Sequence, residues 1–113
     1  MLQTSAKARA LLMARAGAGT VSSFSVNEPA FDLKAAYEVG RELDRLLRAD
    51  GYQRIGRKLG LTNQSIWSEL GLTEPIWAPI YDETVFSEES GSLSHSLAGA
   101  VAPRLEIEVV FQL

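Results

Sequence analysis

The sequence contains no cysteine and a single histidine, His95, among its 113 residues. Disulfide scaffolds, thiol nucleophiles and thiolate zinc sites are therefore excluded, and so is a metal site or proton relay built from several histidines. No apolar run approaches the ~18 residues that a membrane-spanning helix needs. The hydrophobic fraction of 46% and the charged fraction of 22% are typical of a globular protein. We expect one soluble, cytoplasmic domain over residues 1–113, without a membrane partner.

The charge is unevenly distributed along the chain. Residues 1–58 carry ten Lys and Arg against six Asp and Glu, whereas residues 59–113 carry one against eight. The basic half can attract an anionic ligand, and the acidic half can bind a hard cation. Two solvated faces of opposite sign explain the same counts without any ligand. The basic half contains no basic and aromatic module of the kind that binds nucleic acid, so nucleic acid is not an expected partner.

Two helices are expected in the first half of the chain. Residues 5–16 are rich in strong helix formers, with Ser5 as the expected N-cap and two glycines shortly after the end. Residues 17–30 are punctuated by Gly, Ser and Pro and are expected to form a loop. In residues 32–49 the apolar side chains recur at a spacing close to 3.6, and Asp32 is a good N-cap. This second segment is the stronger helix prediction of the two.

The second half of the chain contains shorter elements. Residues 52–58 are a candidate extended segment, and Asn63 is expected to cap a brief helix over residues 64–70. Residues 75–81 contain two prolines, which forbid a helix there. Residues 87–95 are rich in Ser, Glu and Gly and are expected to form a loop. Helices followed by short strands indicate an α+β fold.

Residues 105–113 alternate between apolar and mostly polar side chains, as in a β-strand with one buried face. The apolar face comprises Leu105, Ile107, Val109, Phe111 and Leu113. Glu106 and Glu108 lie two residues apart on the other face, so both carboxylates project to the same side. Such carboxylates repel each other unless a cation or a shared proton intervenes, and Mg²⁺ or Mn²⁺ suits oxygen-only ligands. An ordinary solvent-facing glutamate pair on an edge strand is the alternative.

Several motifs follow one another along the chain: GRKLGLT at residues 56–62, Leu-Gly at residues 70–71, Pro75, and PRLEIE at residues 103–108. Their order and spacing resemble the 2-keto-4-pentenoate hydratase branch of the fumarylacetoacetate hydrolase superfamily. Residues 32–37 also resemble the helix that this family places upstream of those motifs. The resemblance covers residues 31–113, and residues 1–30 form an N-terminal helix and loop before it.

The resemblance implies a site and an activity. Glu106 and Glu108 match two of the three carboxylates that hold the family's Mg²⁺ or Mn²⁺, and Lys58 matches a catalytic lysine facing the substrate pocket. The expected enzyme is a homo-oligomeric hydro-lyase that hydrates a 2-hydroxy-dienoate, or 2-oxo acid, in aromatic-compound catabolism. Lys58 would hold the substrate carboxylate or relay a proton, with a pKa lowered by burial near a cation. A surface lysine in a basic stretch is the alternative reading of Lys58.

The resemblance also implies a larger fold. Family chains are more than twice as long, and their third metal carboxylate and most of their mixed β-roll follow the Glu-x-Glu strand. Residues 1–113 are therefore expected to be a truncated N-terminal portion of such a fold, inactive in isolation. Ile76 stands where many hydratases carry an acid, and it cannot transfer a proton. The sister activities, 4-oxalocrotonate decarboxylase and acylpyruvate hydrolase, therefore stay open, as does a non-catalytic interaction or assembly module.

Overall fold

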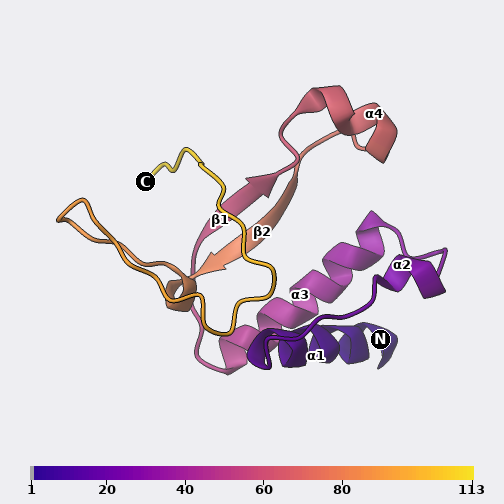
Figure 1. The fold of residues 1–113 in the computed structure, drawn as a ribbon. Coiled ribbons are helices and arrows are strands. Elements are labelled where there is room, and N and C mark those ends of the chain that lie inside the picture. Colours follow the sequence, from indigo (N-terminus) through magenta and orange to yellow (C-terminus); the bar gives the residue numbers. More distant parts are fainter. Residues whose placement is uncertain (1) are drawn as a thin grey trace.

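Two long helices pack against each other in the first half of the chain, and a β-hairpin lies beside them (Figure 1). The computed structural model describes residues 2–113. Helix α1 spans Leu2–Ala16 and helix α3 spans Leu33–Ala49, with the single-turn helix α2 at Phe24–Asn27 between them. Within residues 2–113, every helix is too short or too polar to cross a membrane. The predicted order of helices followed by strands is confirmed.

The hydrophobic core is small and lies between α1 and α3. Ala8 of α1 and Val39 and Leu46 of α3 are buried there. Partly buried apolar side chains surround them, namely Leu11, Leu12, Phe24, Phe31 and Leu43. Because α2 contributes Phe24 to this group, the segment between the two long helices is anchored to the core. The prediction that residues 17–30 form only a loop therefore missed one helical turn.

Helix α3 begins and ends where the sequence predicts, whereas α1 begins earlier. Asp32 Oδ1 accepts a hydrogen bond from the Ala35 amide at 2.8 Å, as an N-cap does. Ser5 was expected to cap α1, but the helix already begins at Leu2 and Ser5 lies inside it. The Ser5 hydroxyl donates instead to Glu42 Oε1 on α3, at 3.3 Å. A contact between the helices has replaced the expected cap.

The two strands form an antiparallel hairpin. Strand β1 spans Arg54–Gly60 and strand β2 spans Ile76–Tyr81, and in the part of the chain that the structure describes the sheet has two strands. Lys58 lies directly opposite Ala78 in the register. The pair is a much smaller sheet than the mixed β-roll implied by the resemblance. The extended candidate at 52–58 is confirmed as a strand to within about two residues. Residues 75–81, where two prolines forbid a helix, form β2.

The connection between the strands folds as the sequence predicts. A 3₁₀ turn at Gln64–Ile66 leads into the short helix α4, Trp67–Leu70. Asn63 Oδ1 accepts from the Ser65 amide at 3.1 Å, which caps the turn. Gly71 ends the helix with φ of 65°, a conformation that favours glycine.

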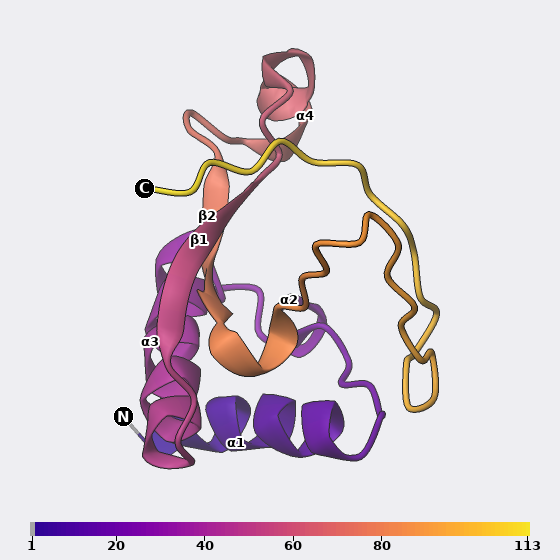
Figure 2. The same ribbon diagram turned by 90° about the vertical axis from the view of Figure 1, so that its left-hand side faces the viewer.

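The hairpin has an inner face packed on α3 and an outer face turned away from that helix. On the inner face, the Trp77 amide donates to Tyr37 Oη at 3.2 Å and the Tyr81 hydroxyl donates to Asp44 at 2.8 Å. Residues two apart in a strand share a face, as do cross-strand partners. The outer face therefore comprises Gly56, Lys58, Gly60, Ile76, Ala78 and Ile80. The C-terminal segment crosses the hairpin in both views (Figure 2).

The strand predicted for residues 105–113 is wrong for this structure. Residues 85–113 contain neither helix nor strand, which confirms the loop at 87–95 but not the strand after it. Leu105 and Ile107 are 93% and 97% exposed. The alternating sequence specifies a face to bury, but a strand also needs a neighbouring backbone to accept its hydrogen bonds.

Candidate metal and substrate site

Lys58 lies near the middle of the outer face of the hairpin. Strand pairing fixes its backbone opposite Ala78. Gly56 and Gly60, two residues away on either side, have no side chains to crowd it. About half of the Lys58 side chain is exposed to solvent. The ammonium group is therefore reachable from the side on which the C-terminal segment crosses.

Glu106 and Glu108 converge on Lys58. Lys58 Nζ donates to Glu106 Oε2 at 3.0 Å and to Glu108 Oε1 at 2.5 Å. Although the segment is not a strand, its two carboxylates project toward the same partner, as their spacing predicts. The structure thus brings together the three residues singled out from the sequence. Their functional roles remain predictions at this point.

Contacts within this cluster shift the pKa values of Lys58 and Glu106. Hydrogen bonds to Glu108 and then to Glu106 raise the pKa of Lys58 above its ordinary value. The hydrogen bond from Lys58 lowers the pKa of Glu106. The expected lowering of the Lys58 pKa requires burial near a cation, whereas in this arrangement the neighbouring charges are carboxylates and the side chain is half exposed. Both shifts favour the charged forms of Lys58 and Glu106.

The donor set of this cluster suits a hard divalent cation. Two carboxylate oxygens already bind one positive charge, the Lys58 ammonium. A metal ion bound by both glutamates would take the place of that ammonium. Oxygen-only ligation is what Mg²⁺ and Mn²⁺ prefer. Over residues 2–113, however, no three acidic or histidine side chains gather closely enough to form a fuller metal site. Two protein ligands are present, rather than the three that the resemblance implies.

An ion pair between the buried Asp44 carboxylate and the partly exposed Arg54 side chain, which the sequence analysis missed, fastens the hairpin to α3. Asp44 of α3 is 4% exposed, and it accepts from Arg54 Nε at 2.6 Å and from Arg54 Nη2 at 2.5 Å. The Tyr81 hydroxyl donates to the same carboxylate at 2.8 Å. A signal was available, because Asp44 lies one residue from Leu43 and three from Leu47, within the apolar stripe of the helix.

This ion pair also perturbs two pKa values. The hydrogen bond from Arg54 holds the pKa of Asp44 below its ordinary value, against the opposing effect of burial. Burial and the hydrogen bond to Asp44 raise the pKa of Tyr81 to about 12. Arg54 begins β1, and Lys58 lies four residues further along it. Asp44 therefore fixes the strand that presents Lys58.

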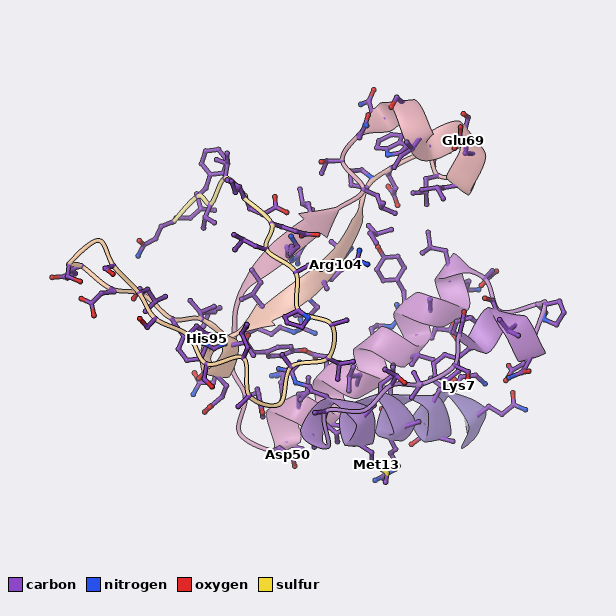
Figure 3. All side chains as sticks on the ribbon, viewed as in Figure 1. Lys7, Met13, Asp50, Glu69, His95 and Arg104 are labelled. Carbon is purple, nitrogen blue, oxygen red and sulfur yellow. The ribbon has the colours of Figure 1, made fainter. Side chains whose placement is uncertain are left out.

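Three further residues can be placed relative to the site. His95 stacks against Phe86 with ring centroids 4.8 Å apart, near the turn that follows β2, whereas Arg104 lies beside the strands (Figure 3). Arg104 contributes a further positive charge that lowers the pKa of Glu106. Ile76 lies on the outer face together with Lys58. The Lys58 ammonium, its two carboxylate partners and the aliphatic Ile76 side chain thus lie on the same side of the hairpin.

Comparison with known proteins identifies the class to which this arrangement is related. The chain is 29% identical over 96 residues to 2-hydroxyhexa-2,4-dienoate hydratase of Comamonas testosteroni, a match covering 85% of this chain and 36% of that protein. It is 29% identical over 93 residues to 2-oxo-hept-4-ene-1,7-dioate hydratase of Escherichia coli, covering 82% of this chain and 34% of that protein. No model of a known protein family matches. The chain spans about a third of the length of these relatives.

A solved structure agrees with the sequence matches. The fold resembles 4-oxalocrotonate decarboxylase from Pseudomonas putida G7, complexed with magnesium and adipate, with a TM-score of 0.67 and 26% identity. The match covers 72% of this chain and 31% of the decarboxylase. In sequence and in fold, the chain therefore resembles enzymes of the fumarylacetoacetate hydrolase superfamily. Within it, the resemblance to the 2-keto-4-pentenoate hydratase branch is confirmed.

Proposed function

We propose that this chain carries part of the active site of a metal-dependent hydro-lyase of the 2-keto-4-pentenoate hydratase type. The observation that carries the proposal is the convergence of Glu106 and Glu108 on the Lys58 ammonium above the outer face of the hairpin. The relatives are named for unbranched acids with an oxygen at the second carbon. We infer the same substrate class here, a 2-hydroxy-dienoate or 2-oxo acid.

Glu106 and Glu108 would hold Mg²⁺ or Mn²⁺, and Lys58 would act on the substrate. The bound ion would polarise the substrate carboxylate and its neighbouring oxygen. Because the two glutamates now bind the Lys58 ammonium, they would hold a metal ion in its place, and the ammonium would then be free above the outer face. There Lys58 can hold the substrate carboxylate or donate a proton to the carbon chain while water adds to the distal double bond.

The larger fold belongs to the same proposal. In a hydratase-length protein, residues 105–113 would become a strand of a mixed β-roll, and a further acidic side chain would complete the metal site. The alternation of residues 105–113 and the exposure of their apolar side chains support this assignment. The same exposed side chains favour self-association, so we propose a homo-oligomer.

A decarboxylase or hydrolase is the second candidate activity. Ile76 stands where many hydratases carry an acid, and it lies on the outer face with Lys58. A Cβ atom placed on Gly60 would lie 3.2 Å from Ile76 Cγ1, so the side chain at position 76 reaches over β1. An aliphatic group there removes a proton donor and suits loss of carbon dioxide better than addition of water. The similarity to 4-oxalocrotonate decarboxylase favours the same alternative.

A non-catalytic assembly module is the third candidate. The exposed apolar side chains of residues 105–113 favour it, because contiguous apolar patches of this kind mark protein contacts. Metal-dependent binding of a small acid distinguishes the two candidates, because it is expected of the enzyme and not of an assembly module.

The proposal is tested by metal-dependent binding of 2-oxopentanoate to the 113-residue chain, followed by NMR. We expect binding with Mg²⁺, loss of binding in EDTA, and loss in a Glu106→Gln, Glu108→Gln variant. The matched control is Glu88→Gln, Glu89→Gln, which makes the same charge change in an exposed loop. Failure of the native chain to bind 2-oxopentanoate with Mg²⁺ would contradict the proposed function and favour the assembly module.

A further inference from the structure

The positions next to Lys58 on the outer face of the hairpin carry small residues. Gly56 and Gly60 flank the lysine along β1, and Ala78 lies opposite it on β2. Neither glycine is among the residues with positive φ, so the backbone does not require glycine at these two positions. Backbone conformation therefore does not explain why Gly56, Gly60 and Ala78, three small residues, surround Lys58.

The space above the glycines is bounded by aliphatic side chains of β2. A Cβ on Gly60 would lie 3.2 Å from Ile76 Cγ1, and a Cβ on Gly56 would lie 3.9 Å from Ile80 Cδ1. Ile76 and Ile80 therefore lean over the glycines and border Ala78, which lies between them and is exposed. Ile76, Ala78 and Ile80 together form an apolar surface, which we call the apolar floor. The short Ala78 side chain makes its centre lower than its two ends, and the Lys58 ammonium lies at its edge.

We propose that this floor binds the hydrocarbon chain of the substrate, and that Ala78 makes it selective for an unbranched chain. The inference rests on the proposed function and adds a residue that sets specificity. A planar, unbranched acid can lie over Ala78 while its carboxylate faces Lys58 and the glutamate-bound ion. A branched chain is thicker, so its added methyl group would meet the bordering isoleucines before the chain reached Ala78. Excluding a methyl group in this way is worth about tenfold in affinity.

Two probes and one substitution test the inference on the 113-residue chain with Mg²⁺. The probes are 2-oxopentanoate, which is unbranched, and 4-methyl-2-oxopentanoate, which carries one added methyl group. We expect the native chain to bind the unbranched acid about five- to tenfold more tightly. Ala78→Leu should weaken binding of 2-oxopentanoate by about tenfold while leaving Mn²⁺ affinity unchanged. Ala6→Leu, on the exposed surface of α1, is the matched control and should change neither affinity.

A second variant guards against misfolding of the first. Gly56→Ala adds one methyl group to the same face at ordinary contact distance from Ile80, and it should weaken 2-oxopentanoate binding about two- to threefold. Circular dichroism checks that both variants fold. If the native chain binds both acids equally and neither variant alters binding, the inference is wrong while the proposed function stands. If the native chain binds neither acid, the proposed function is wrong and the inference falls with it.

Discussion

The Lys58 ammonium lies 2.5 Å from Glu108 Oε1, although the two residues are 50 positions apart in the sequence. Glu106 reaches the same ammonium at 3.0 Å. Ion pairs this exposed stabilise a fold only slightly, because water and salt screen them. Their importance here lies in the charge balance of the site. A metal ion that binds both glutamates has to compete with Lys58.

The first prediction follows from this competition. Lys58→Met removes the competing ammonium, so the variant should bind Mn²⁺ about three- to tenfold more tightly than the native chain at low salt. Lys34→Met is the control, since Lys34 is an exposed lysine on α3, and it should leave Mn²⁺ affinity nearly unchanged. Water-proton relaxation measures both affinities. Weaker binding by Lys58→Met would show that Lys58 does not compete for the glutamates.

The second prediction concerns the ion pair between α3 and β1. Asp44→Asn should lower the free energy of unfolding by about 1.5–3 kcal/mol, because a buried amide cannot replace charge-assisted hydrogen bonds from Arg54. Asp50→Asn makes the same substitution at an exposed position after α3 and should change stability by less than about 0.5 kcal/mol. Urea unfolding followed by circular dichroism measures the difference. If the two substitutions lowered the free energy of unfolding equally, the ion pair of Asp44 with Arg54 would not stabilise the fold.

The third prediction is the pH dependence of the same carboxylate. The pKa of Asp44 is lowered in the folded state, so folding gains stability from the ionised form above the unfolded pKa, about 3.9. That stability is lost as the pH falls from about 4 through the lower folded pKa. The difference in unfolding free energy between the native chain and Asp44→Asn should therefore shrink with falling pH below about 4. A difference that stays constant over this range would contradict the assignment.

The sequence predicts the elements that are determined locally. Helix α3 begins after its Asp32 cap, and Asn63 caps the turn before α4, because each cap depends on neighbouring backbone amides. The boundary of α1 was not predictable in this way, since the Ser5 hydroxyl found its partner on another helix, at Glu42. Local signals thus predict most of the architecture, while contacts between distant segments adjust it.

The candidate site could be predicted only in part. The motifs around Lys58 and the Glu-x-Glu spacing identified its three charged residues, but the sequence did not show that the lysine binds both acids. Asp44 was missed because a charged residue in an apolar stripe shows its partner only in three dimensions. The strand at residues 105–113 was wrong because alternation specifies a buried face without specifying a neighbour.

The fourth prediction concerns the exposed C-terminal segment. The native chain should self-associate in light scattering, since Ile107 and Phe111 are exposed in a segment with several other exposed apolar side chains. Ile107→Ser combined with Phe111→Ser should shift the population toward monomer. The control is Leu93→Ser combined with Leu97→Ser, which removes two exposed leucines from a different loop and should leave the association unchanged. A monodisperse native monomer would contradict the proposed assembly.

The most direct test of the site is Mn²⁺ binding to the native chain and to Glu106→Gln, Glu108→Gln. Two carboxylates should hold Mn²⁺ weakly, because affinity follows the number and charge of the ligands. Titration calorimetry should show one weak site in the native chain. The site should be retained in the control variant Glu88→Gln, Glu89→Gln and absent from Glu106→Gln, Glu108→Gln. Identical binding by all three proteins would show that Glu106 and Glu108 do not form the metal site.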